Sequence, residues 1–162
     1  TVFLERKLRT RGLLAKRRSR ASMDDLGRLG GHEAQPGWAG YWFHRRLLVR
    51  GLRPVCQISY RRTARVAMTA YGPIRLTMDD VLRALPVTGL NFSDGPAVPL
   101  LEDRVILEMK FRYGMPAQFK YLLEEFALMP RPFSKYRLAV EALDLLNTGR
   151  AITRHNLAPA YA

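Results

Sequence analysis

The sequence predicts an α+β domain built on antiparallel strands. Three observations support this class. Several segments alternate polar and apolar residues with the period of two that is typical of a half-buried strand. Two segments toward the carboxyl end carry apolar residues at helical spacing. Strands and helices do not alternate regularly, as they would in a parallel sheet with crossover helices.

The chain is expected to open with a β-hairpin. Residues 1–9 alternate in polarity, Thr10-Arg11-Gly12 suits a tight turn, and residues 13–20 pair back as the second strand. Alternation places Val2, Leu4 and Leu8 on one face of the first strand and Glu5, Lys7 and Arg9 on the other.

Two helices are expected after the hairpin. Ser22 can cap a short helix over residues 23–29, which Gly30-Gly31 would end. A second helix is expected to begin near Pro36, because the residues that follow it are at helical spacing: Trp38, Tyr41, Trp42 and Arg45.

The middle of the chain predicts three further strands. We expect them over residues 54–68, 74–79 and 104–112, with Gly72-Pro73 as the turn between the first two. Residues 87–99 are rich in Gly and Pro and indicate a loop with at most a short strand.

The carboxyl end predicts two helices, over residues 116–128 and 134–146, the second capped by Ser134. Both are expected to cover the apolar face of the sheet. Residues 1–146 would then form one domain, followed by a tail over residues 147–162.

Charge is the strongest compositional signal. The chain has 162 residues, with 27 Lys and Arg against 14 Asp and Glu, for a net charge of +13. Such an excess indicates a polyanion or an acidic membrane surface as the partner.

Residue counts exclude several kinds of site. The single cysteine excludes an intramolecular disulfide, the three histidines lack zinc-ligand spacing, and no apolar run reaches the ~20 residues that cross a bilayer. We therefore expect a cytoplasmic protein, or one at the cytoplasmic face of a membrane, and the Arg, Ala and Gly usage suggests a bacterial source.

The charges gather on one face of the predicted strands. On a curled sheet they would converge into a groove or tunnel, where a dense polyanion would relieve their repulsion. Arg binds phosphate through a planar fork and Lys as a point charge, so the mixture suits a chain of phosphates. Glu5 and Glu108 are candidate ligands for a divalent metal, although Glu5 is better interpreted as a counter-ion. The face-sharing groups are Glu5 with Lys7, Lys16 with Arg18, Tyr60 with Arg62, Arg75 with Thr77 and Asp79, and Glu108 with Lys110 and Arg112.

Six segments in order resemble a known family. They are TVFLERK (1–7), LLAKRRSR (13–20), ISYRRTAR (58–65), IRLTMDD (74–80), VILEMKF (105–111) and PFSKY (132–136). In this order they are similar to the VTC domain, the polyphosphate polymerase domain of the vacuolar transporter chaperone family and its bacterial relatives, within the triphosphate tunnel superfamily. The resemblance covers roughly residues 1–146.

The resemblance implies an antiparallel β-tunnel with helices packed outside. It further implies extension of inorganic polyphosphate from ATP with Mn²⁺ or Mg²⁺. Carried over by position, the phosphate-binding catalytic residues would be Lys7, Lys16, Arg18, Arg62 and Arg75. Glu108 would hold the metal, Lys135 would contact phosphate near the tunnel mouth, and Glu5, Tyr60 and Lys110 would be further substrate-binding positions.

The chain departs from the family pattern at its front. The family's domain begins with a Glu-x-Lys element and an Arg-x-Arg strand, and neither precedes Thr1. We therefore expect an amino-terminally truncated domain, whose tunnel lacks part of its wall.

Other interpretations stay open. The same scaffold could hydrolyse triphosphates, or serve as a non-catalytic basic module that binds polyphosphate or nucleic acid. A charged strand face is also the ordinary solvated side of a sheet, and the clusters at Arg45-Arg46 and residues 17–20 could contact a membrane surface or nucleic acid. No GxxxxGK[ST] phosphate loop is present, so side chains would have to hold a nucleotide. We expect ATP and polyphosphate as partners, a membrane-anchored domain as a further option, and no specific nucleic acid.

Overall fold

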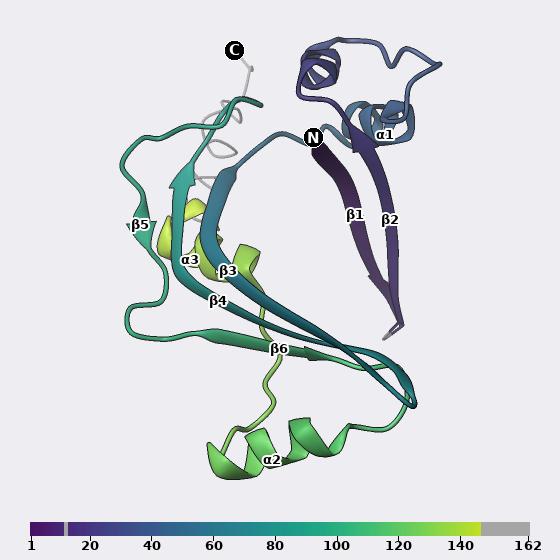
Figure 1. Ribbon diagram of the computed structural model, residues 1–162. Helices are drawn as coiled ribbons and strands as arrows, with labels where there is room; N and C mark the ends of the chain where they lie inside the picture. The colour runs from purple at the N-terminus through teal and green to yellow at the C-terminus, as the bar shows by residue number, and fades with distance from the viewer. Residues whose placement is uncertain (12, 147–162) are drawn as a thin grey trace. The chain divides into compact units, whose positions relative to one another are not determined.

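The computed structural model describes residues 1–11 and 13–146 and divides them into two compact units (Figure 1). The hairpin unit comprises Thr1–Val55 and Val87–Ser93, and the sheet unit comprises Cys56–Pro86 with the described residues from Asp94 onward. The described helices are all too short or too polar to cross a membrane. The predicted tail, residues 147–162, lies outside the described residues.

The hairpin unit is built on the predicted β-hairpin. Strands β1 (Val2–Thr10) and β2 (Leu13–Ala21) pair antiparallel in unbroken register, from Val2 opposite Ala21 to Thr10 opposite Leu13. Directly opposed residues point to the same face of an antiparallel pair. One face therefore carries Leu4 and Ala21, which are both buried, and the other carries Glu5.

Two helical segments follow the hairpin. The first, η1 (Asp24–Gly30), is a 3₁₀ helix that begins at a reciprocal pair: Asp25 N donates to Ser22 Oγ (3.1 Å), and Ser22 N donates to Asp25 Oδ2 (3.2 Å). The second, α1 (Tyr41–Arg50), begins later than the expected Pro36. The backbone of Gly37 has a φ of 91°, which is incompatible with a right-handed helix.

The core of the hairpin unit lies between the strands and these helices. Leu4, Ala21 and Leu29 are buried together, and partly buried side chains surround them. The surrounding side chains are Val2, Leu26, Trp38, Phe43, Leu47 and Leu90. The helices therefore cover the apolar face of the hairpin and leave its charged face uncovered within this unit.

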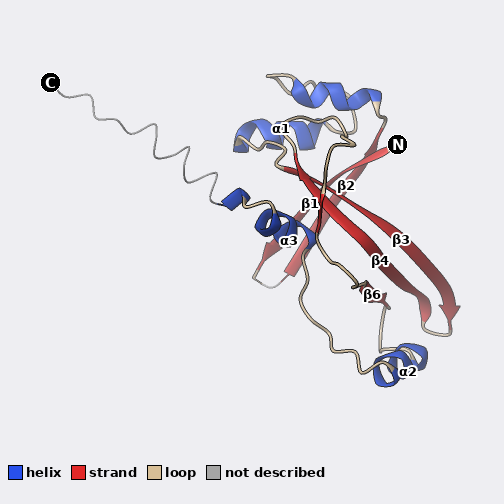
Figure 2. Ribbon diagram, turned by 90° about the vertical axis from the view of Figure 1, so that its left-hand side faces the viewer, coloured by secondary structure: helices blue, strands red, loops and turns tan. Residues whose placement is uncertain are grey.

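The sheet unit is organised around one shared strand. Strand β4 (Gly72–Pro86) pairs antiparallel along its whole length with β3 (Cys56–Thr69), beside which it runs in both ribbon views (Figure 2). On its other edge it pairs first with β6 (Ile106–Lys110) and then with β5 (Val98–Pro99). Strand β4 therefore extends beyond the predicted 74–79. The α+β class with antiparallel sheets is confirmed, and over the described residues the sheets are not closed into a barrel.

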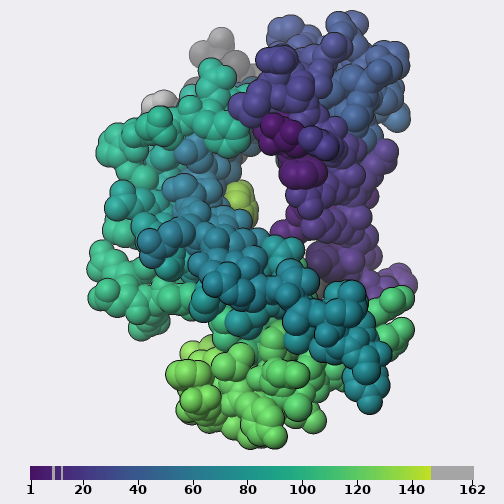
Figure 3. Space-filling view, in the orientation of Figure 1, coloured from purple at the N-terminus to yellow at the C-terminus, as the bar shows by residue number. Residues whose placement is uncertain are grey.

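The far end of the β3–β4 hairpin is exposed. Val66, Met68 and Tyr71 near the turn are 70%, 77% and 75% exposed, and this segment lies at the surface in the space-filling view (Figure 3). The most deeply buried apolar side chains of the two strands lie at the opposite end, where Leu82 and Ala84 are 1% and 0% exposed.

Two helices complete the sheet unit. Helix α2 (Ala117–Glu125) buries Phe119, whose ring centre lies 6.2 Å from that of Phe111. Helix α3 (Lys135–Ala142) is capped by Ser134, whose Oγ accepts a hydrogen bond from Arg137 N (3.3 Å), so the predicted cap is confirmed. Both helices are shorter than expected.

Helix α3 covers the face of the sheet that carries the charges, so the expectation that it lies on the apolar face is wrong. The pairing explains why. Arg62 is opposite Asp79, and Ile58, four residues earlier on the same strand, is opposite Ala84. Asp79 and Ala84 therefore share a face although they are five residues apart, because the register shifts between Ser59 and Arg61. This face is charged at one end and apolar at the other, and α3 buries Ala139 and Val140 in its packing.

We predict that Leu82→Ala lowers the free energy of unfolding by about 2–5 kcal/mol, because it removes a fully buried side chain from the α3-packed end of the sheet. Val66→Ala, at a 70% exposed position of the same sheet, is the matched control and should change it by less than about 0.5 kcal/mol. Urea denaturation followed by circular dichroism measures both. Equal effects of the two substitutions would contradict the described core.

Candidate functional site

Four predicted site residues gather on the charged face of the hairpin. The register sets Glu5 opposite Arg18 and Lys7 opposite Lys16. Glu5 is contacted by all three cations: Lys16 Nζ lies 2.7 Å from Oε2, Lys7 Nζ 3.4 Å from Oε1, and Arg18 Nε 3.9 Å from Oε2. The Arg18 guanidinium also lies 3.5 Å above the ring centre of Phe3, which restricts its orientation.

Positive charge is in excess in this cluster. Hydrogen bonding from Lys16, followed by that from Lys7, lowers the pKa of Glu5, which is thus ionised at neutral pH. One carboxylate faces three cations, so two positive charges stay uncompensated within the cluster. Glu5 thus pairs with all three cations, and the excess charge can attract an anion.

Three predicted residues of the sheet unit meet around Asp79. Arg62 binds the carboxylate through both ends of its fork, with Nε 2.5 Å from Oδ1 and Nη2 2.6 Å from Oδ2. Lys135 Nζ reaches Oδ2 from the first turn of α3, also at 2.5 Å. Tyr60 lies beneath both cations, its ring centre 5.1 Å from the Arg62 guanidinium and 4.6 Å from Lys135 Nζ.

Asp79 is the residue that sequence reasoning did not assign to the site. Its side chain is only 2% exposed, whereas those of Arg62 and Lys135 are 34% and 23% exposed. The Arg62 hydrogen bonds, followed by that of Lys135, lower the pKa of Asp79 to about 2 against the opposing effect of burial. The pKa of Arg62 is raised by the same contact. The buried carboxylate thus fixes two cations whose outer surfaces are still accessible.

The other predicted residues of the sheet unit share this face. Glu108 is opposite Thr77 and Arg75 is opposite Lys110. Glu108 Oε1 lies 3.0 Å from Lys110 Nζ, and the Glu108 side chain is 47% exposed. Over the described part of the chain, Arg75 forms no ion pair and the buried Oγ1 of Thr77 has no hydrogen-bond partner. The exposed Arg75 on this stretch of the face is therefore able to bind an anion, whereas the Thr77 hydroxyl is buried.

Glu108 would have to bind a metal with little help from the protein. No cluster of three or more His, Cys, Asp or Glu side chains occurs among the described residues. Asp79, on the same face, is occupied by Arg62 and Lys135. Mg²⁺ and similar ions are commonly held by one or two carboxylates together with substrate phosphates. A partly exposed Glu108 fits that limited role.

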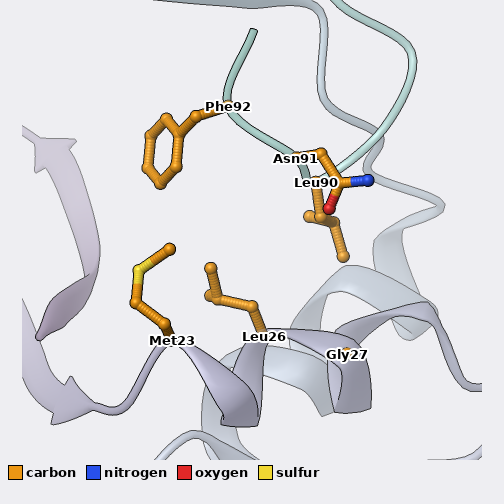
Figure 4. A pocket seen from close by; sticks show the side chains of 6 residues that line it. All are labelled: Met23, Leu26, Gly27, Leu90, Asn91 and Phe92. Atoms are coloured by element: carbon orange, nitrogen blue, oxygen red, sulfur yellow. The ribbon is translucent and has the colours of Figure 1, made fainter.

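A separate pocket in the hairpin unit has a different character (Figure 4). It encloses about 550 Å³ between η1 and the Val87–Ser93 segment, where Met23, Leu26 and Phe92 contribute apolar side chains. Its remaining lining residues are Gly27, Leu90 and Asn91. It contains no charged residue and none of the predicted site residues, so it does not suit a phosphate.

Fold and site together define a basic α+β protein that presents clustered Lys and Arg side chains on the faces of antiparallel strands. A comparison with protein families identifies the family: the VTC domain model matches residues 1–144. The chain therefore belongs to the VTC domain family, as its motifs indicated. No curated protein and no solved structure matched the chain.

The pKa of Asp79 predicts a pH effect on stability. Because the folded-state pKa is lowered from 3.8 to about 2, the ionised carboxylate stabilises the fold above about pH 4, and this contribution disappears as the pH falls toward 2. The contribution amounts to about 2 kcal/mol. Asp79→Asn should therefore destabilise the protein at pH 7 and reduce the slope of stability between about pH 4 and pH 2.

Asp80→Asn is the matched control for this experiment. Asp80 pairs with Arg61 on the opposite face, and its side chain is 34% exposed. Urea denaturation at a series of pH values should show the Asp79-dependent slope intact in this control. An unchanged slope in Asp79→Asn would show that the buried contact does not form.

Proposed function

We propose that the chain is a polyphosphate polymerase domain that transfers phosphoryl groups from ATP to a growing inorganic polyphosphate chain. The observation that carries the proposal is the excess of cations over carboxylates in the cluster around Glu5. Membership of the VTC domain family supports polyphosphate as the anion. Both ATP and polyphosphate offer consecutive phosphates, which Arg and Lys side chains can bind without contacting a base.

The reaction requires little covalent chemistry from the protein. A terminal phosphate oxygen of the acceptor chain attacks the γ-phosphorus of ATP and forms a new P–O bond. The bond between that phosphorus and the β–γ bridging oxygen breaks, and ADP leaves with the bonding electrons. Because the attacking oxygen is already anionic, the protein's task is to align the two phosphate groups and to stabilise the charge of the transition state.

The two carboxylate-centred clusters would have different parts in this task. Glu5 is partly exposed, and its contact with Arg18 is long at 3.9 Å, so phosphate can displace it from its cations. Asp79 is buried and holds Arg62 through a fork, so it would keep Arg62 and Lys135 in place while their exposed surfaces bind phosphate. Arg75 and Lys110 would extend this basic surface along the same strand face.

Glu108 would hold Mn²⁺ or Mg²⁺. When bound, such an ion neutralises phosphate oxygens and orients them for transfer. Lys110 Nζ lies 3.0 Å from Glu108 Oε1 and would become available to bind phosphate when the carboxylate binds the ion.

Incubation with ATP and Mn²⁺ tests the reaction. We expect polyphosphate chains on a polyacrylamide gel, together with one ADP for each phosphate added. Release of free phosphate without chains would indicate the tunnel hydrolase instead. Binding of polyphosphate without consumption of ATP would indicate a non-catalytic module.

Glu108→Ala tests the metal-binding role. We expect turnover to fall by about 100-fold, because charge stabilisation at the transferred phosphate is lost. Polyphosphate binding without metal should stay within about threefold, because the substitution removes no cation. Glu125→Ala, an exposed carboxylate at the end of α2, is the matched control. Equal turnover of both variants would exclude Glu108 as the metal ligand.

A further inference from the structure

A second basic cluster lies on the opposite face of the β1–β2 hairpin from Glu5. Arg6 is opposite Arg17 in the register, and because Arg6 lies between Glu5 and Lys7 it points to the other face. These two arginines join residues of α1 around a cavity of about 210 Å³. The α1 residues are Trp42, Arg45, Arg46 and Val49. We call this cavity the arginine pocket.

The arginine pocket has no acidic counterpart. Among the described residues, Arg6, Arg17, Arg45 and Arg46 take part in no ion pair. Like charges directly opposite in a sheet are destabilising. In addition, the Nε of Arg6 is buried and has no hydrogen-bond partner in the described part of the chain. An anion in the cavity would offset the repulsion and accept hydrogen bonds from the exposed guanidinium groups of Arg17 and Arg45.

Neighbouring contacts hold the pocket in shape. Trp42 Nε1 donates a hydrogen bond of 2.6 Å to Ser19 Oγ, which fixes the indole against β2. The Arg17 guanidinium lies 4.4 Å from the centre of that ring. Arg45 and Arg46 follow Trp42 by three and four residues, so all three lie on one side of α1.

We propose that the arginine pocket is a phosphate-binding site separate from the substrate-binding face. Guanidinium forks match phosphate oxygens, and a cavity of about 210 Å³ is smaller than the ~300–1,000 Å³ of pockets for drug-sized molecules. Because Arg17 already lies over one face of the Trp42 ring, that face is closed to a nucleobase, which favours phosphate over nucleic acid. The phosphate can belong to a free inorganic oligophosphate or to a phospholipid headgroup.

Titration with tripolyphosphate, followed by NMR of the two tryptophan indole N–H groups, tests the site. We expect a saturable shift of the Trp42 signal and a smaller one of Trp38. The double variant Arg45→Ala/Arg46→Ala should weaken this binding at least about tenfold, because each arginine supplies charge-assisted hydrogen bonds. Alanine favours helix, so α1 should stay folded. Circular dichroism checks that α1 is folded. Arg17→Lys, which keeps the positive charge but loses the guanidinium fork, is a second test that leaves α1 unaltered.

Two controls separate the pocket from other basic surfaces. Arg50→Ala/Arg53→Ala removes the same charge from exposed positions that do not line the pocket, and it should weaken the Trp42-detected binding by less than about threefold. Lys16→Ala/Arg18→Ala removes cations of the opposite hairpin face and should leave the Trp42 shift in place, even if the proposed polymerase activity is absent. A Trp42 signal that does not move, or equal weakening by the Arg45/Arg46 and Arg50/Arg53 variants, would overturn the proposal.

Vesicle flotation distinguishes the two sources of phosphate. Phosphatidylcholine vesicles with and without phosphatidic acid are compared for the parent chain and the Arg45/Arg46 variant. Acid-dependent flotation that the variant loses, with at least tenfold weaker tripolyphosphate binding, supports a site open to lipid headgroups. The same loss of tripolyphosphate binding without flotation supports a site for free oligophosphates.

Discussion

Excess positive charge on the strand faces is the constraint on which this structure depends. The chain carries a net charge of +13, and its strand pairs include cations directly opposite one another, such as Lys7 and Lys16. Two carboxylates moderate this repulsion in different ways. Glu5 is partly exposed and shared among three cations, whereas Asp79 is buried and bound through a fork by Arg62. The first arrangement is suited to exchange with another anion and the second to a fixed geometry.

In the sheet unit, the Asp79 cluster and the packing of α3 lie on one face of the sheet. A register shift in the β3–β4 pair brings Leu82 and Ala84 onto the face that carries Asp79. The apolar end of that face binds α3, and the first residue of α3 is Lys135. Packing of the helix and pairing of Lys135 with Asp79 therefore support each other. The packed core and the candidate site are continuous here, because Asp79 binds both Arg62 on β3 and Lys135 on α3.

The hairpin unit uses both faces of two strands for different purposes. Its uncovered face carries the Glu5 cluster, and its covered face contributes Leu4 and Ala21 to the core beside α1. Farther along the covered face, apolar residues give way to Arg6 and Arg17, where α1 adds Arg45 and Arg46. Because successive residues of a strand point to opposite sides, one run of basic residues supplies both surfaces. The first surface contains the residues of the proposed polyphosphate site, and the second forms where α1 packs beside the strands.

The sequence by itself determined the strands, their charged faces, the Ser134 cap and the grouping of Glu5, Lys7, Lys16 and Arg18. These features depend on strand alternation, on a short turn and on a capping hydrogen bond between residues three apart, and all of these are local. Only the tertiary structure decided that β4 continues to Pro86, that η1 is a 3₁₀ helix, and that α3 packs on the charged face. It also revealed Asp79, because its partner Lys135 lies 56 residues away in the chain and local pattern carries no information on contacts between distant segments.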